Sequence, residues 1–378
     1  MHTVTVFPLG NADCCRLDLA GGQKILVDYA NTRNADDPSD RRVDLEKELR
    51  ADLKAAKRDS FDVVAFTHLD TDHFCGSSEF FELRHAAKYQ GKDRIKITEM
   101  WVPAAAIYED RSDLAEEGRV IQAEARHRLK QGEGIRVFSR PAKLEAWLNA
   151  QGLTLQSRMH LITDAGQLVP GFSRSEQGVE FFVHSPFASR QDDGTFVDRN
   201  TCSLVMQAVF EVLGRETKVI LAADTTHDVW TEIVRITKFH KRPERLEWDV
   251  FKLPHHCSYL SLGPEKGKEK TQPVDAVRWI MEEQDQLGAT LVSTSDPIPT
   301  EDTDLPPHRQ AAKYYRDNRG ARGGTFVVTM EHPKVSAPEP LVITIDHRKA
   351  TIRKRATAAS VAVTSVVAPR AGAGRRRS

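Results

Sequence analysis

Short apolar runs and amphipathic stretches alternate along the chain. Residues 2–9 alternate apolar and polar side chains, which predicts a strand, and residues 14–30 predict two strands joined by a Gly-Gly hairpin. Leucines recur every four residues within 43–58, which predicts an amphipathic helix. The run FDVVAF at 61–66 then predicts a buried strand.

The same alternation continues to the end of the chain. Apolar runs predict further strands, with helical patterns between the later ones, at 178–186, 201–212, 217–224, 248–256, 289–295, 324–330 and 340–346. Residues 105–180 read as a variable, largely helical insertion. Strand hairpins at both ends with βα units between them predict a layered αββα sandwich, formed by one domain over residues 1–347.

Composition adds little to this picture. The chain has 378 residues, with 54 Lys and Arg against 54 Asp and Glu, so net charge gives no argument for a nucleic-acid or membrane partner. Residues 348–378 are basic, and from 352 onward they contain no acidic residue. We interpret them as a disordered tail that solubilises the chain or grips nucleic acid weakly.

Cysteine usage and hydropathy bear on the compartment. Five cysteines without paired spacing argue against a disulfide framework, which fits a reducing cytoplasm. No apolar run reaches the roughly 20 residues that a membrane helix needs, so we expect no membrane partner.

Four metal-ligand side chains follow the strand at 61–66. The spacing His-x-Asp-x-Asp-His cannot form one helix face, but it suits a loop that wraps around a point; its members are His68, Asp70, Asp72 and His73. Histidine nitrogen and carboxylate oxygen bind divalent metals. The motif therefore predicts a metal pair, and the plain alternative is a polar loop with capping aspartates.

Three distant segments make that alternative less attractive. Each ends a predicted strand with side chains of the same kind: His184 after 178–183, Asp224 after 217–223, and His255 with His256 after 248–253. Sites gather where strand ends converge. The residues alone leave open whether His255 or His256 is the ligand, and a lone histidine such as His184 is as often structural.

The ordered segments HLDTDH, AAD and PHHCS resemble the metallo-β-lactamase superfamily, and most closely the hydrolase domain of the competence protein ComEC. The opening hairpin, the NTCSLVMQ strand and the closing strand-helix-strand segment are also similar to that branch. The resemblance implies a four-layer α/β sandwich. The chain departs from the superfamily pattern at Asp70, usually histidine, and at Tyr29 and Cys257, both usually glycine.

The resemblance implies two metal sites. His68, Asp70 and His184 would hold one ion, Asp72, His73 and His255 the other, and Asp224 would bridge them. Two divalent ions about 3.5–4 Å apart can share a water and lower its pKa toward 7. The carboxylates at each centre fit Mn²⁺ as well as Zn²⁺.

A hydroxide bound by both metals would attack a phosphodiester, which makes a phosphodiesterase, above all a nuclease, the first hypothesis. Asp72 belongs to the catalytic set. His256 or His308 would protonate the leaving group, and the residues expected to contact phosphate are Asn200, Ser203 and Lys252.

Two alternatives stay open from the sequence. One is an enzyme for a small phosphodiester. The other is a metal-binding interaction module in a larger assembly, with the helical insertion and the basic tail as docking elements for a protein partner.

Overall fold

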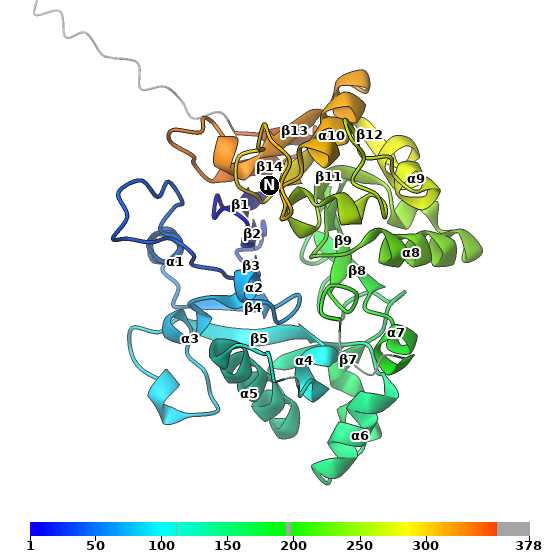
Figure 1. Cartoon of the computed structure of the whole chain (residues 1–378). Helices are drawn as coiled ribbons and strands as arrows, with labels where there is room; N and C mark the ends of the chain where they lie inside the picture. Colours follow the sequence, from blue (N-terminus) through cyan, green and yellow to red (C-terminus); the bar gives the residue numbers. More distant parts are fainter. Residues whose placement is uncertain (111, 194–197, 354–378) are drawn as a thin grey trace, which may run out of the picture.

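Two β-sheets packed face to face form the centre of the molecule, and helices cover both outer faces (Figure 1). The coordinates are a computed structural model, and the structure describes residues 1–110, 112–193 and 198–353. The first sheet has nine strands in the order β15-β14-β1-β2-β3-β4-β5-β6-β7, and the second has six in the order β13-β12-β11-β10-β9-β8. The predicted αββα sandwich is confirmed.

The first sheet is antiparallel at one end and parallel from β3 to β7. Gly22 takes φ of 91° between β2 and β3, a conformation that favours glycine, so the predicted Gly-Gly turn closes the hairpin. The strands are β1 (His2–Val6), β2 (Cys15–Asp18), β3 (Lys24–Val27), β4 (Ser60–Ala65), β5 (Lys96–Pro103), β6 (Ile135–Phe138), β7 (Ile162–Thr163), β14 (Leu341–Ile345) and β15 (Ala350–Ile352).

The second sheet pairs β8 with β9 and β9 with β10 antiparallel, and runs parallel from β10 to β13. Parallel neighbours end at the same edge of a sheet, so the segments after β10 and β11 lie side by side there. The strands are β8 (Val179–Ser185), β9 (Val205–Val212), β10 (Arg215–Leu221), β11 (Trp248–Lys252), β12 (Asp285–Ser293) and β13 (Thr325–Val328).

Helices connect most of the parallel strands. The α-helices are α1 (Leu45–Ala55), α2 (Thr71–Phe74), α3 (Ser77–Phe80), α4 (Ala105–Tyr108), α5 (Glu116–Gln131), α6 (Ala142–Ala150), α7 (Ala188–Asp193), α8 (His227–Phe239), α9 (Asp275–Glu283) and α10 (Arg309–Ala321). The 3₁₀ turns are η1 (Ala87–Tyr89), η2 (Gln156–Leu161), η3 (Pro243–Arg245), η4 (His255–Cys257), η5 (Tyr259–Ser261) and η6 (Thr329–Glu331). No helix within the described ranges is long and apolar enough to cross a membrane.

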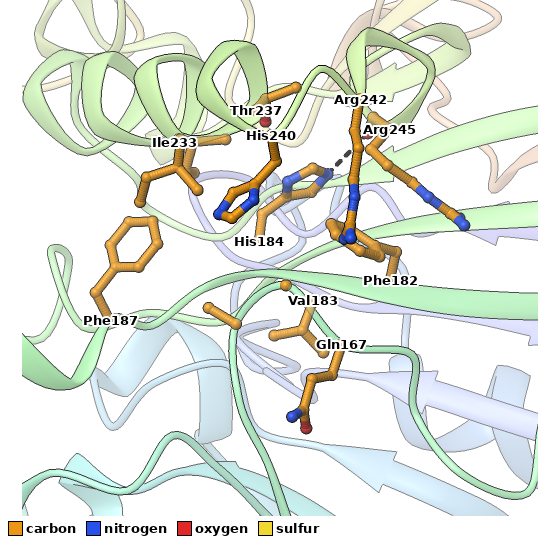
Figure 2. Close-up of a pocket in the computed structure, with 13 residues that line it drawn as sticks. Gln167, Phe182, Val183, His184, Phe187, Ile233, Thr237, His240, Arg242 and Arg245 are labelled. Carbon is orange, nitrogen blue, oxygen red and sulfur yellow. Dashed lines mark hydrogen bonds between the residues drawn. The ribbon is translucent and has the colours of Figure 1, made fainter.

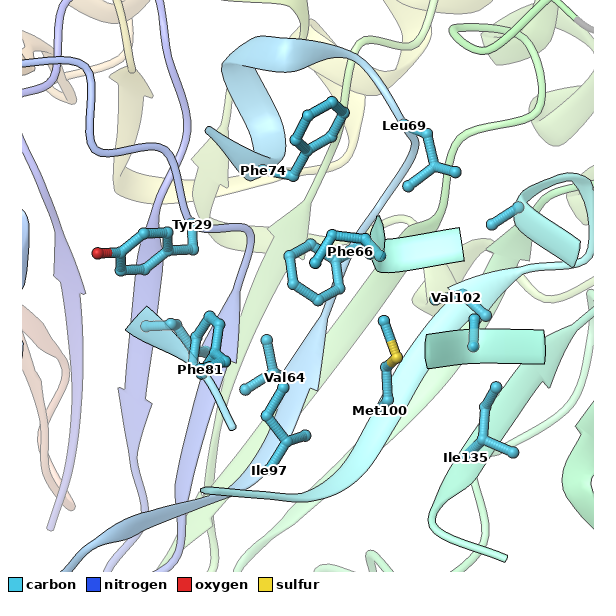
Figure 3. Packing of buried hydrophobic residues seen from close by; sticks show 14 of the residues in the cluster. Tyr29, Val64, Phe66, Leu69, Phe74, Phe81, Ile97, Met100, Val102 and Ile135 are labelled. Carbon is cyan, nitrogen blue, oxygen red and sulfur yellow. The ribbon is translucent and has the colours of Figure 1, made fainter. Parts of the chain in front are cut away.

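Strand alternation explains the layers. In β4 and the residue after it, Val64 and Phe66 join the hydrophobic cluster under the helices (Figure 3), whereas Val63 and Ala65 join the cluster between the two sheets. A third cluster lies between the second sheet and α8, α9 and α10. Because β4 has a hydrophobic cluster on each of its two faces, its residues form a nearly continuous apolar run in the sequence.

Two segments differ from expectation. The insertion at 105–180 contains α4, α5 and α6, but it also contributes β6 and β7, which extend the first sheet by parallel pairing. Strand β15 lies inside the segment assigned to the tail and pairs with β14. The rest of that predicted tail, 354–378, lies outside the described residues.

Candidate metal centre

The predicted ligand motif leaves β4 as a loop and then forms one turn of helix. Asp70 is the N-cap of α2, and Asp72 and His73 lie within that turn. The edge where β4 ends faces the segments that follow β10 and β11 in the other sheet. Asp224 and His256 come from those segments, which brings side chains from both sheets together.

Four of these side chains form the four-residue centre: Asp72, His73, Asp224 and His256. One nitrogen or carboxylate oxygen from each lies within 4.8 Å of the others. His73 Nε2 is 3.3 Å from Asp224 Oδ1, and His256 Nε2 is 2.9 Å from Asp72 Oδ2. Three of the four are buried, and Asp72 is the most exposed.

Hydrogen bonds from behind fix the rings of both histidines. His73 Nδ1–H donates to Asp28 Oδ2 at 2.8 Å, and Asp28 in turn accepts from the backbone N–H and the hydroxyl of Thr67 at 2.7 and 2.8 Å. His256 Nδ1–H donates to the carbonyl oxygen of Thr294 at 2.7 Å. Both Nε2 atoms therefore point into the centre, as metal-binding histidines require.

His68 and Asp70 lie beside this centre. The rings of His68 and His73 have centroids 4.0 Å apart, and His68 Nε2 is 3.6 Å from Asp70 Oδ2. The Thr67 hydroxyl donates its only proton to Asp28. His68 Nδ1–H must therefore donate to Thr67 Oγ1, 3.1 Å away. His68 Nε2 is then left with a free lone pair.

Several buried atoms at the site lack hydrogen-bond partners among the residues that the structure describes. They include Nε2 of His68, Nε2 of His73 and Oδ1 of Asp224, with Oδ1 of Asp13 and Nδ1 of His255 beside them. Buried polar atoms are rarely left unsatisfied. Divalent cations bound at the site would satisfy the two Nε2 atoms and the Asp224 oxygen, and these nitrogen and oxygen donors fit Zn²⁺ or Mn²⁺.

Protonation behaviour supports the same fit. Burial opposes the charged form, yet the carboxylates of Asp224 and Asp72 raise the pKa of His256 to about 9. Asp28, Asp224 and Asp72 likewise hold the pKa of His73 well above its usual value. Burial favours the neutral carboxyl of Asp224, but His73 and His256 hold its pKa well below the usual range. Without a metal, protons on His73 and His256 therefore balance the negative charge of the aspartates. A bound metal cation would neutralise the same carboxylates in place of these protons.

His255 lies next to the centre rather than in it. Its Nε2 is 4.0 Å from Asp224 Oδ2, and its side chain is 21% exposed. His255, His256 and Cys257 take φ of 49°, 50° and 67°, a left-handed turn that costs of order 1 kcal/mol per residue. This turn aims both histidines toward Asp224, with His256 the nearer to the four-residue centre.

Lys252 does not face a substrate. Burial opposes its charge, but Asp13 raises the pKa of Lys252, whose Nζ donates to Asp13 Oδ2 at 2.6 Å and to the carbonyl of Ala222 at 3.0 Å. Both side chains are almost fully buried. The expected phosphate contact is corrected, because Lys252 is the countercharge of a buried carboxylate.

His184 is not brought to the centre. Its Nε2–H donates to the carbonyl oxygen of Arg245 at 2.8 Å, and its ring lines a separate cavity under α8 (Figure 2). β8 ends at the same edge of its sheet as β10 but two strands away, and His184 lies on the face of the sheet covered by α8. The expected ligand role of His184 is therefore corrected.

Among the remaining predicted helpers, the side chains of His308 and Ser203 have structural partners. His308 Nδ1 accepts from the backbone N–H of Tyr259 and its Nε2–H donates to the carbonyl of Asp304, both at 3.3 Å, so it has no free proton for a leaving group. The Ser203 hydroxyl donates to the carbonyl oxygen of Asn200 at 2.7 Å. Asn200 Oδ1 is buried without a hydrogen-bond partner among the described residues.

Sequence analysis missed three side chains of the site: Asp13, Asp28 and Arg199. Arg199 Nη1 donates to Asp70 Oδ1 at 2.9 Å, and the same guanidinium pairs with Glu109 and Asp113 of the insertion. Of these three, only Asp28 could have been found from the sequence, because it directly follows an apolar strand, as Asp224 does. Asp13 and Arg199 carry no such signal.

No protein-family model matches the chain, and no curated protein matches it in sequence. Among solved structures, a diphosphatase from the PhnP family is 11% identical, with coverage of 92% of this chain and 98% of that one and a TM-score of 0.35. Unliganded yeast PDE1 is 10% identical, with coverage of 86% and 97% and a TM-score of 0.45. A class B3 di-zinc metallo-β-lactamase from an Alaskan soil metagenome is 8% identical, with coverage of 63% and 70% and a TM-score of 0.27. Similarity this weak assigns no activity to the chain.

Proposed function

We propose that this chain is a divalent-metal-dependent hydrolase whose substrate is a phosphodiester. One observation carries the proposal: side chains from both sheets meet with their metal-binding atoms directed at one another. The buried Nε2 of His73 and Oδ1 of Asp224 are 3.3 Å apart and have no hydrogen-bond partner within the described part of the chain. Maintaining such an arrangement is costly unless a cation is bound there.

Each side chain has a defined part in holding the cations. Asp28 and the carbonyl of Thr294 orient His73 and His256 and keep the Nδ1 proton in place. Asp72 is the most exposed member and faces the approach of a substrate. When bound, the divalent cations would supply Lewis-acid polarisation of a phosphoryl oxygen and would acidify a water.

We place a second cation beside His68 and Asp70. The buried Nε2 of His68 has a free lone pair, and Asp70 Oδ2 is 3.6 Å away. Arg199 holds the other oxygen of Asp70 and fixes its orientation. Asp224 is the shared ligand in this proposal, because its carboxylate lies close to His73 and His256 and also interacts electrostatically with His68.

A phosphodiester is the substrate class that this charge arrangement favours. Lys252 and Arg199 are both committed to carboxylates, so the metal cations would have to neutralise the substrate's negative charge. Nucleic acid is the first polymer to test, because the resemblance to the ComEC branch and the basic segment at 354–378 favour it. A small phosphodiester is the alternative.

The test combines metal analysis with turnover. The protein, loaded with Mn²⁺ or Zn²⁺, should hydrolyse bis-p-nitrophenyl phosphate, and Asp224→Asn should lose both the bound metal and the activity. Asp317→Asn, a surface change on α10, is the matched control and should retain both. A panel of single- and double-stranded DNA, RNA and cyclic nucleotides then assigns the substrate. A protein that stays metal-free in both ions would overturn the proposal.

A further inference from the structure

A cavity of about 400 Å³ lies under α8, and we name it the α8 cavity (Figure 2). Its walls come from β8, from the loop at 165–167, from α8 and from the turn that follows α8. None of the side chains of the four-residue centre lines it. The α8 cavity is therefore a second concave site, of a size that suits a small molecule.

One side of the α8 cavity is apolar. Phe187 and Ile233 form this wall, and Val183 and Ile236 are also among the apolar lining residues. In Figure 2 the ring of Phe187 and the side chain of Ile233 lie together at one end, away from the arginines. An apolar body would be desolvated against this wall.

The opposite side carries positive charge. Arg242 and Arg245 line it, and no aspartate or glutamate is among the lining residues. Glu180 Oε1 accepts from Arg245 Nη1 at 2.7 Å, and the Arg245 guanidinium lies over the ring of Phe182. Arg242 is exposed and makes no ion pair with any residue in the described ranges. One guanidinium at the mouth thus has its charge uncompensated.

His184 gives this site a neutral polar group. Its Nε2–H is used by the carbonyl of Arg245, which leaves Nδ1 as an acceptor. Burial lowers the pKa of His184 to about 4, so the ring is uncharged at neutral pH. The charge of the cavity therefore comes from its arginines.

We propose that the α8 cavity binds a small organic anion, with its apolar body against Phe187 and Ile233 and its anionic group on Arg242. A guanidinium binds carboxylate, sulfonate or phosphate oxygens through paired hydrogen bonds, and the apolar wall supplies the remaining affinity. The site is independent of the metal centre, so the two proposals stand or fall separately.

The test titrates the purified full-length protein with naphthalene-2-sulfonate by calorimetry, beside the neutral analogue 2-naphthalenemethanol. The sulfonate should bind at one site, and the neutral analogue at least about fivefold more weakly. Arg242→Gln should weaken sulfonate binding about five- to tenfold and leave binding of the neutral analogue unchanged. Arg235→Gln, an exposed arginine of α8 outside the lining, is the matched control and should change neither.

Asp224→Asn separates the two sites. Because none of the four side chains of the metal centre lines the α8 cavity, this variant should bind the sulfonate as the unmodified protein does. No binding at millimolar probe would overturn the proposal, as would equal affinity of Arg242→Gln for the sulfonate. Loss of sulfonate binding in Asp224→Asn would also overturn it, since the probe would then occupy the metal centre.

Discussion

The four-residue centre and the α8 cavity both contain histidine at strand ends, yet their electrostatics are opposite. In the centre, aspartates face His73 and His256 and raise the pKa of both rings. In the cavity, burial lowers the pKa of His184 to about 4. These charges are the basis for proposing a cation site in the first region and an anion site in the second.

The difference teaches how to recognise a ligand histidine. His73 and His256 each use Nδ1 for a hydrogen bond from behind and direct Nε2 at carboxylates. His184 uses Nε2 itself for a backbone carbonyl. A position at the end of a strand is therefore not enough, and the partner of each ring nitrogen decides the role.

The largest effect should separate these histidines directly. His73→Ala and His256→Ala should each lower metal-dependent phosphodiester hydrolysis at least about 10⁴-fold, a loss typical for removal of central active-site groups. Metal content, measured by elemental analysis, should fall with it. His184→Ala should lose stability but keep its metal within twofold. Metal loss in His184→Ala would remove the distinction between the two regions.

Lys252→Met tests whether the floor of the centre is structural. Removing the cation leaves Asp13 charged and buried, which should lower the free energy of unfolding by about 3–5 kcal/mol in urea denaturation. The double variant Asp13→Asn with Lys252→Met removes both charges and should recover most of that loss. If Lys252→Met instead kept its stability but had a raised KM, Lys252 would be a substrate-binding residue.

Asp28→Asn should weaken metal binding without removing a ligand. The substitution removes the negative charge that accepts from His73 Nδ1–H. His73 Nε2 then donates its electron pair to a metal less well, so metal affinity should drop about 10- to 100-fold. Chelator competition measures the affinity without relying on turnover. Asp62→Asn is the control, since Asp62 also accepts from a backbone N–H but lies outside the centre.

The pH dependence of metal binding should be steep on the acid side. Metal binding requires an unprotonated Nε2, and the pKa of His256 without metal is about 9, so a bound metal must displace that proton throughout the neutral range. Affinity for Mn²⁺ should therefore rise about tenfold per pH unit for each proton displaced, between pH 6 and 8. Proton release in calorimetry, measured in buffers of different ionisation enthalpy, checks the stoichiometry. A flat profile would mean that both rings are already neutral without metal.

How much the sequence predicted depends on the range of the interaction. The layered fold followed from apolar periodicity, and Asp72, His73 and Asp224 could be grouped because each stands just after a strand. Both signals are local. The structure brings these three side chains together, with His256 as the fourth.

The failures depend on partners far away in the chain. Lys252 meets Asp13 across 239 residues, and His184 meets the carbonyl of Arg245 across 61. No pattern near either residue encodes such a bond, so a polar side chain at a strand end reads as a site residue in both cases. Arg199 was not predicted for the same physical reason, because its hydrogen bond to Asp70 spans 129 residues.

The smallest effect concerns His308, whose ring is held at both nitrogens. Tyr259 N–H donates to Nδ1, and Nε2–H donates to the carbonyl of Asp304, so the ring links the turn after His256 to the loop before α10. His308→Gln should therefore change kcat by less than about threefold while lowering the free energy of unfolding by about 1–2 kcal/mol. Burial lowers the pKa of His308, so the ring is neutral near pH 7 and is not the imidazolium that a general acid requires. If the variant instead lost one limb of the pH–rate profile, His308 would be the leaving-group acid, and occupation of both ring nitrogens would no longer exclude a catalytic role.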